Sequence, residues 1–214
     1  GIGKSMAIAL AQHGGTIIIS SRKIDVLKKT AEEINETIGE ERVFPVAANA
    51  GRKEELENLV NAARQLSGKI DVLVCNAGVN PHYGPMSDIS DEAYDKTMAT
   101  NVKSNHWLCQ MVVPDMAERG GGSIMITSSV GAFEPSLNLG TYHISKLAVI
   151  GLVRNLAAEY GPQNIRVNAV CPALIKTDFA KALWDDDSKA KEAISKIPLG
   201  RLGEPEDLQG LAVF

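Results

Sequence analysis

Short apolar runs alternate with amphipathic helical patterns along almost the whole chain. Runs rich in β-branched residues predict strands at residues 16–20, 42–48, 70–74, 123–127 and 165–170. The segments between them predict helices within residues 1–14, 25–38, 53–66, 91–116 and 142–160. When helices separate successive strands in this way, the strands run parallel and helices cover both faces of the sheet. The alternation therefore predicts an α/β fold, a doubly wound parallel sheet, in a single domain over residues 1–214.

The composition is that of an ordinary folded domain and disfavours several classes of function. The 214 residues are 44% hydrophobic and 22% charged, with a net charge of −4. This acidic balance gives no support for nucleic-acid binding, and no apolar run approaches the roughly 20 residues of a membrane span. Cys75, Cys109 and Cys171 are odd in number and scattered, which suits a reducing compartment. We therefore expect a cytoplasmic protein with no nucleic-acid or membrane partner.

Three polar side chains are expected to meet near the end of the strand at residues 123–127. Ser129 closely follows that strand, and Tyr142 and Lys146 open the next predicted helix, four positions apart. Residues with this spacing project from one face of a helix. A hydroxyl, a phenol and an ammonium would then lie above one strand end, where they can move a proton onto or off an oxygen.

Lys146 is a suitable partner for making Tyr142 acidic. A free phenol has a pKa of about 10, and lowering it to about 7 requires roughly 4 kcal/mol in favour of the phenolate. One ammonium at about 4 Å, in an effective dielectric of about 20, supplies a similar amount. Taken alone, the Tyr-x-x-x-Lys spacing is also that of an ordinary surface pair. The position of Ser129 at a strand end upstream favours a catalytic site.

Several short motifs are spread along the chain: Ser129, Tyr142-x-x-x-Lys146, Asn76-Ala77-Gly78, Asn101 and Gly1-Ile2-Gly3. In their order and spacing, these motifs resemble the short-chain dehydrogenase/reductase family. Within the family, the NADP-dependent carbonyl reductases are the most similar group, on segments 20–23, 80–81, 101–103, 119–123, 164–168, 174–177 and 201–207. The resemblance covers nearly the whole chain and implies a Rossmann-like fold. It also implies that the first and last strands of the sheet are absent from the given sequence.

The start of the chain predicts a phosphate-binding turn. Gly1, Ile2 and Gly3 open a helix, and glycines there let backbone N–H groups approach a phosphate. Together with Gly3, the following Lys4 and Ser5 also imitate the phosphate loop of nucleotide hydrolases. No later strand end supplies the aspartate that such enzymes use for Mg²⁺, so a dinucleotide is the better reading.

The residues about 20 positions further on bear on the choice between NAD and NADP. Ser21, Arg22 and Lys23 stand there without a carboxylate. A hydroxyl and two cations can bind a ribose 2′-phosphate, and no acid repels it. This favours NADP(H), although Arg22 and Lys23 also suit the solvated start of a helix.

The resemblance implies further roles that the pattern alone does not explain. Lys146 would also hold the nicotinamide ribose, and Asn101 would support a water-linked proton path through Lys146. Other implied cofactor contacts are Asn49 near the adenine, the turn of Asn76, Ala77 and Gly78, and Pro172, Ile175 and Thr177 near the carboxamide. Asn49 departs from the family's frequent aspartate, and Ala173 from its usual glycine.

Together these residues predict reduction of a carbonyl to an alcohol by hydride transfer from NADPH, or the reverse. Tyr142 would protonate the substrate oxygen and Ser129 would hydrogen-bond it. Residues 176–197 are expected to form a helical lid over a small carbonyl or alcohol substrate. Apolar pocket walls are expected from His82, Tyr83, Phe133, Pro135, Leu137, Phe179, Leu183 and Trp184. The alternatives are a 3-oxoacyl-[acyl-carrier-protein] reductase, which shares every catalytic motif, and a cofactor-binding regulator without turnover.

The helices expected at 91–116 and 142–160 are apolar almost all round. One side of each can pack on the sheet, and a second copy of the chain is the simplest cover for the other. The resemblance, to a family of dimers and tetramers, also implies a homo-oligomer and leaves peroxisomal targeting open. No metal is expected, since His13, His82 and His106 show no ligand spacing. His143 is assigned no role, because neighbours in a helix point apart.

Overall fold

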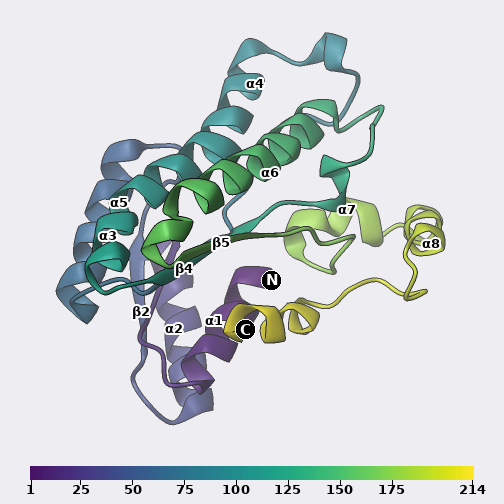
Figure 1. The fold of residues 1–214 in the computed structure, drawn as a ribbon. Coiled ribbons are helices and arrows are strands. Elements are labelled where there is room, and N and C mark those ends of the chain that lie inside the picture. Colours follow the sequence, from purple (N-terminus) through teal and green to yellow (C-terminus); the bar gives the residue numbers. More distant parts are fainter. The chain divides into compact units, whose positions relative to one another are not determined.

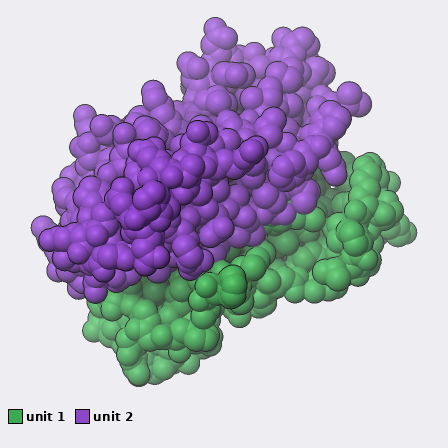
Figure 2. All heavy atoms as spheres, viewed as in Figure 1, with its two compact units in different colours: residues 1–19, 25–45, 172–214 green, residues 20–24, 46–171 purple.

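The computed structural model describes residues 1–214 (Figure 1). Its contacts divide the chain into two compact units, which have different colours in Figure 2. Unit 1 consists of residues 1–19, 25–45 and 172–214, and unit 2 consists of residues 20–24 and 46–171. The single domain expected over residues 1–214 stays a prediction.

Unit 2 contains a three-stranded parallel sheet. The strands β3 (Val72–Cys75), β4 (Gly122–Thr127) and β5 (Ile165–Val170) are neighbours in that order. Both pairs run parallel, and Val72 lies opposite Ser123 in the register. The parallel direction predicted from the alternation of elements is confirmed for these strands. Because the strands are parallel, their carboxyl ends meet at one edge of the sheet.

Helices supply the rest of the core of unit 2. They are α3 (Lys53–Ser67), α4 (Asp91–Met98), α5 (Ser104–Glu118) and α6 (Gly140–Tyr160), with 3₁₀ turns η1 (Met86–Asp88), η3 (Val130–Ala132) and η4 (Gly161–Gln163). The buried apolar cluster consists of Val60, Cys75, Cys109, Val112, Val113, Met116, Ile124, Ile126, Val149, Val153, Leu156, Ile165 and Val167. These side chains pack α6 against β5 and α5 against the sheet, so the start of α6 is held near the end of β4.

The continuous helix expected over residues 91–116 is wrong in one respect. A π-helical turn, Ala99–Lys103, separates α4 from α5. Such a turn interrupts the regular backbone ladder of an α-helix and is frequent at functional sites. Asn105 Nδ2 donates to Asn101 O at 2.7 Å, and Ser104 Oγ donates to Thr100 O at 2.6 Å. Buried polar side chains therefore satisfy two carbonyl groups of the turn.

Unit 1 has a smaller core of its own. The helices α1 (Ile2–Gln12) and α2 (Ile24–Ile38) accompany β1 (Ile17–Ser21) and β2 (Val43–Ala47), which form a separate two-stranded sheet. The last two residues of each of these strands and the first residue of α2 are counted in unit 2. Its buried cluster consists of Ala7, Ala11, Ala31, Ile34 and Val43. All five predicted strands are present, with ends that differ by at most two residues from the expected ones.

Short helices and turns make up the C-terminal part of unit 1. They are η5 (Asp178–Ala180), α7 (Lys181–Trp184), α8 (Asp187–Lys196), η6 (Pro205–Leu208) and α9 (Gln209–Val213). Lys176 N donates to Gly203 O at 2.9 Å, and Gly203 N donates to Leu174 O at 3.0 Å. Residues 176–201 are thus tied together at their base, and none of them is buried. No helix in the chain is both long and apolar enough to span a bilayer.

Candidate active site

Ser129 lies just beyond the carboxyl end of β4, where the chain enters η3. Its Oγ accepts a hydrogen bond from Gly131 N at 3.1 Å. The neighbouring Ser128 is buried and donates from Oγ to the carbonyl oxygen of Lys146 at 2.8 Å. The strand end is therefore fastened to α6 by one serine, while the next serine offers its hydroxyl at the start of the turn.

Tyr142 and Lys146 project from the same side of α6. Lys146 Nζ lies 5.5 Å from the centroid of the Tyr142 ring, and the Ser129 hydroxyl hydrogen-bonds the phenol. Lys146 is only 3% exposed, and its Nζ donates to Thr127 O at 2.8 Å. The structure thus brings together the hydroxyl, the phenol and the ammonium that the sequence singled out.

Burial dominates the pKa values of this group. Burial raises the pKa of Tyr142 above its ordinary value, and the hydrogen bond with Ser129 lowers it only in part. Burial also lowers the pKa of Lys146 to about 8, against a smaller opposing effect of Cys171. The direction for Tyr142 is opposite to the one expected from Lys146. The physical reason is that loss of hydration disfavours the phenolate more than the hydrogen bond with Ser129 favours it.

Asn101 lies in the π turn and is fully buried. Its Oδ1 accepts from Val79 N at 2.8 Å, and its Nδ2 donates to Val79 O at 2.9 Å and to Ser145 Oγ at 3.0 Å. Ser145 Oγ donates in turn to the carbonyl oxygen of Tyr142 at 2.6 Å. A chain of hydrogen bonds therefore joins the segment after β3 to the first turn of α6.

Ser128 and Ser145 are site residues that sequence reasoning missed. Each lies directly before a predicted catalytic residue, Ser129 and Lys146 respectively. Both are buried, and each donates to a main-chain carbonyl of α6. A hydroxyl next to a catalytic residue in an apolar context was the available signal, because a buried hydroxyl requires a hydrogen-bond partner.

The turn of Asn76, Ala77 and Gly78 borders the same group. Thr127 Oγ1 donates to Asn76 Oδ1 at 3.2 Å, beside the strand end that leads to Ser129. A Cβ at Gly78 would lie 3.6 Å from Lys146 Nζ and 3.6 Å from an oxygen of Asn101. The backbone of this turn therefore runs close to the buried ammonium.

The residues expected to select the cofactor lie elsewhere in unit 2. Ser21 ends β1, and its carbonyl oxygen accepts from Ala48 N at 3.0 Å. Arg22 and Lys23 follow and are exposed, and Asn49 comes directly after Ala48. The main-chain bond between Ser21 and Ala48 thus brings the two strand-end segments side by side.

The remaining expected cofactor residues belong to unit 1. Gly1 caps α1, and Ile2 and Gly3 form its first turn. A Cβ at Gly1 would lie 3.4 Å from Thr177 Cγ2, so the start of α1 is next to the segment at 172–177. Within that segment, Ile175 is buried and pairs with Gly203. Unit 1 therefore holds two of the predicted cofactor segments together.

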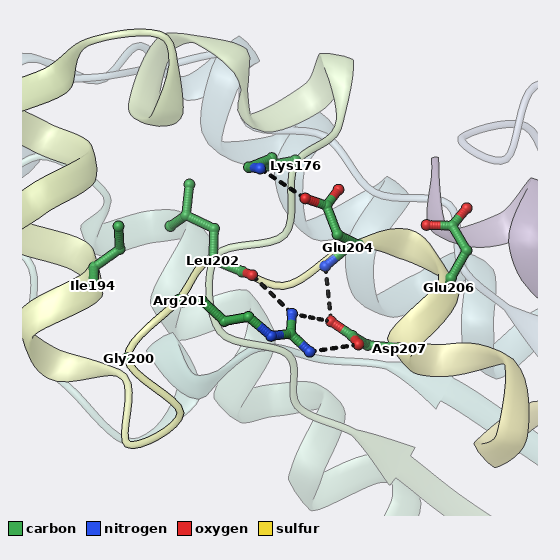
Figure 3. Close-up of a pocket in the computed structure, with 8 residues that line it drawn as sticks. All are labelled: Lys176, Ile194, Gly200, Arg201, Leu202, Glu204, Glu206 and Asp207. Carbon is green, nitrogen blue, oxygen red and sulfur yellow. Dashed lines mark hydrogen bonds and ion pairs between the residues drawn. The ribbon is translucent and has the colours of Figure 1, made fainter.

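Unit 1 also contains a hollow of about 590 Å³ that is separate from these residues (Figure 3). It is lined by Lys176, Ile194, Gly200, Arg201, Leu202, Glu204, Glu206 and Asp207. Lys176 pairs with Glu204 at 2.7 Å, and Arg201 donates two hydrogen bonds to Asp207 at 2.7 and 2.8 Å. The bond to Arg201 holds the pKa of Asp207 well below its usual range. Since none of the predicted catalytic or cofactor-binding residues lines the hollow, it is not the candidate active site.

Comparison with known proteins identifies the family. A family model described as Enoyl-(Acyl carrier protein) reductase matches residues 1–214. Dehydrogenase/reductase SDR family member 4 of Oryctolagus cuniculus is 43% identical over 215 residues, which cover 100% of this chain and 82% of the relative. The chain belongs to the short-chain dehydrogenase/reductase (SDR) family. The member 4 protein of Homo sapiens is 42% identical to this SDR chain, over 100% of this chain and 76% of that relative.

Solved structures agree with the SDR assignment. Levodione reductase matches with a TM-score of 0.94 and 28% identity, over 100% of this chain and 85% of that chain. A 7α-hydroxysteroid dehydrogenase, complexed with NADH and 7-oxo glycochenodeoxycholic acid, matches with a TM-score of 0.92 and 33% identity. The match covers 100% of this chain and 82% of that chain. The predicted family and the Rossmann-like α/β fold are confirmed, and this SDR chain is an enzyme of an oxidoreductase family.

Proposed function

We propose that this SDR chain reduces the carbonyl group of a small molecule to an alcohol with NADPH, or catalyses the reverse oxidation. The observation that carries the proposal is the adjacency of Ser129, Tyr142 and Lys146 in unit 2. A phenol hydrogen-bonded by a hydroxyl, with a buried ammonium beside it, is suited to moving a proton to or from a substrate oxygen. Relatives named as dehydrogenases and reductases support the same class of reaction.

Each residue has a separate task in the proposed reaction. Tyr142 donates its proton to the substrate oxygen, and Ser129 hydrogen-bonds the same oxygen. Lys146 stabilises the phenolate that remains, and Asn101 positions the first turn of α6 through Ser145 and supports a water-linked proton path to Lys146. The bound nicotinamide supplies the hydride. Because burial raises the pKa of Tyr142, the phenol of the free enzyme stays protonated, which is the form that the proposed reduction requires.

The surroundings of Lys146 fit a nicotinamide nucleotide. An ammonium has three donors, and Lys146 Nζ uses one on Thr127 O, which leaves donors for ribose hydroxyls. Gly78 brings a side-chain-free stretch of backbone to the same place. We assign cofactor contacts to Gly1, Ile2, Gly3, Ser21, Arg22, Lys23, Asn49, Asn76, Ala77, Gly78, Tyr142, Lys146, Pro172, Ile175 and Thr177. No group of three or more His, Cys, Asp or Glu side chains lies together as a metal site would require.

The exposed cations after β1 favour NADP(H). Solved relatives include complexes with NADH and one with NADP, so the local residues decide the preference. In Arg22→Asp, the new carboxylate repels a 2′-phosphate and accepts from a 2′-hydroxyl. We expect the ratio of kcat/KM for NADPH to that for NADH to fall roughly tenfold or more, as befits the loss of a charged hydrogen bond. An unchanged ratio in steady-state assays would contradict this assignment.

Exposed apolar residues support an apolar carbonyl substrate. In unit 2, Tyr83, Phe133 and Leu137 are exposed in the loops that precede α4 and α6. In unit 1, residues 176–197 are proposed as the lid, with Trp184 Nε1 donating to Thr177 O at 2.8 Å. A helical segment with no buried residue and a paired base is free to open locally, as a lid requires.

Two alternative functions have weaker support. A 3-oxoacyl-[acyl-carrier-protein] reductase is favoured by a solved Brucella melitensis 3-ketoacyl-(acyl-carrier-protein) reductase with a TM-score of 0.91, and the description of the family model also names an acyl carrier protein. An acidic carrier needs free cations, yet Arg119 pairs with Asp71 at 3.0 Å and Lys103 lies 5.5 Å from the Trp107 ring centroid. A regulator without turnover is disfavoured by the intact catalytic group.

One assay separates the three functions. NADPH consumption is followed with simple ketones, α-dicarbonyls and an acetoacetyl thioester. Consumption with small carbonyls supports the proposed carbonyl reductase. Consumption with the thioester alone supports the carrier-protein reductase, and none with any substrate supports the regulator.

The Tyr142→Phe variant tests the catalytic assignment. We expect carbonyl reduction to fall to background, because phenylalanine cannot give a proton to the substrate oxygen. NADPH binding, measured by fluorescence titration, should remain largely intact because the ring is retained. Full turnover in the variant would remove Tyr142 from the mechanism.

A further inference from the structure

His143 follows Tyr142 on α6 but contacts a different part of unit 2. Its Nδ1 lies 2.7 Å from the carbonyl oxygen of Glu134. A carbonyl can only accept, so Nδ1 carries the hydrogen and donates it. The rings of His143 and Tyr142 are 6.1 Å apart and tilted by 57°, so they are not stacked. The imidazole therefore binds the loop that follows Ser129.

The same imidazole packs directly against the backbone of that loop. A Cβ at Gly131 would meet His143 Nε2 at 2.5 Å and Cδ2 at 2.8 Å, closer than real atoms approach. Only glycine leaves room for the ring at this position. Gly131 also donates its N–H to Ser129 Oγ at 3.1 Å. The ring thus rests on the residue that hydrogen-bonds the Ser129 hydroxyl.

We propose that His143 is a positioning residue for Ser129. It holds η3 between a hydrogen bond to Glu134 and a packing contact with Gly131, and so fixes the direction of the Ser129 hydroxyl relative to Tyr142. The inference rests on the proposed function, in which Ser129 hydrogen-bonds the substrate oxygen. Because His143 and Tyr142 are consecutive, one helical turn positions both the phenol and the serine.

Two substitutions separate the hydrogen bond from the packing. His143→Phe keeps a flat ring and removes the donor, whereas His143→Asn keeps an N–H close to the place of Nδ1. We expect His143→Phe to lower kcat about tenfold with little change in KM for NADPH, and His143→Asn to restore part of the loss. His13→Phe is the matched control, since His13 Nδ1 lies 2.8 Å from the Ala9 carbonyl oxygen at the end of α1. Its kcat should equal that of the wild type.

Amide hydrogen exchange gives a readout that does not depend on turnover. Gly131 N is bonded to Ser129 Oγ, and Phe133 N to Val130 O at 2.9 Å. Both amides should exchange faster in His143→Phe than in the wild type, with no change in His13→Phe. If the wild type reduces carbonyls and His143→Phe matches it in kcat and exchange, the inference is overturned and the proposed function stands. If the wild type is inactive but the exchange differs as expected, the proposed function fails and the anchoring of the turn stands.

Discussion

The buried ammonium of Lys146 links the candidate site to the stability of the fold. Burial lowers its pKa from 10.5 to about 8. Between these two values the unfolded chain binds more protons than the folded one, so stability rises with pH across this window. Below about pH 8, the buried charge opposes folding by about 3 kcal/mol. The lysine that the proposed mechanism needs is therefore one that destabilises the resting protein.

Lys146→Met should expose this cost as a difference in pH dependence. The free energy of unfolding of the wild type, relative to Lys146→Met, should rise by up to about 3 kcal/mol from pH 8 to pH 10.5. Urea denaturation at several pH values measures the difference, in which the effects of other titrating groups cancel. Lys28→Met, at an exposed position of α2, is the control. Its free energy of unfolding should change with pH in parallel with that of the wild type. If the free energy of unfolding of Lys146→Met also changed with pH in parallel with that of the wild type, burial would not lower the pKa of Lys146.

The sequence predicted which candidate catalytic residues meet but not how they titrate. Tyr142 and Lys146 are four apart on a helix, and that spacing alone places them on one face. The pKa of Tyr142 depends on how much water reaches it, and burial is a property of the assembled unit. For the same reason, the contact of His143 with Gly131 was not predictable, since it depends on the path of a loop.

At the scale of elements, the π turn between α4 and α5 is stabilised by side chains. Asn105 is buried, and its Nδ2 donates to Asn101 O at 2.7 Å. Asn105→Ala leaves that carbonyl without this donor, so the free energy of unfolding should fall by about 1–3 kcal/mol in urea denaturation. Thr37→Ala removes a similar side-chain bond, to Glu33 O at 2.7 Å, from the exposed face of α2. This control should change stability by less than about 0.5 kcal/mol, and equal losses would contradict a special role for Asn105.

Apolar periodicity predicted the existence of each element better than its internal geometry. The predicted bounds of the strand at 165–170 and of the helix at 53–66 agree with the structure to within one residue, because the apolar pattern of each element ends where its packing ends. The π turn was missed because an interruption inside a helix leaves the apolar pattern nearly unchanged. Thr100, Asn101, Ser104 and Asn105, polar residues within an apolar stretch, were the available sign.

At the scale of the whole molecule, we propose that the chain self-associates through the outer face of α6. Leu147 is 54% exposed there, and Ile144 on the same helix is also exposed. Leu147→Glu places a charge in the proposed interface, so its mass by light scattering should drop below that of a dimeric or tetrameric wild type. Val26→Glu, at a position 57% exposed on α2, should keep the wild-type mass. A monomeric wild type would disprove the interface.

The pairing of Gly203 with Leu174 and Lys176 has a consequence for how new specificities arise. A stretch closed at its base can be lengthened, shortened or exchanged with little effect on what lies outside it. Doubling the length of such a flexible loop costs only about 0.6 kcal/mol in closure entropy. If this stretch is the proposed lid, another segment grafted between the two anchor points would change which molecules are accepted and leave the rest of unit 1 unaltered.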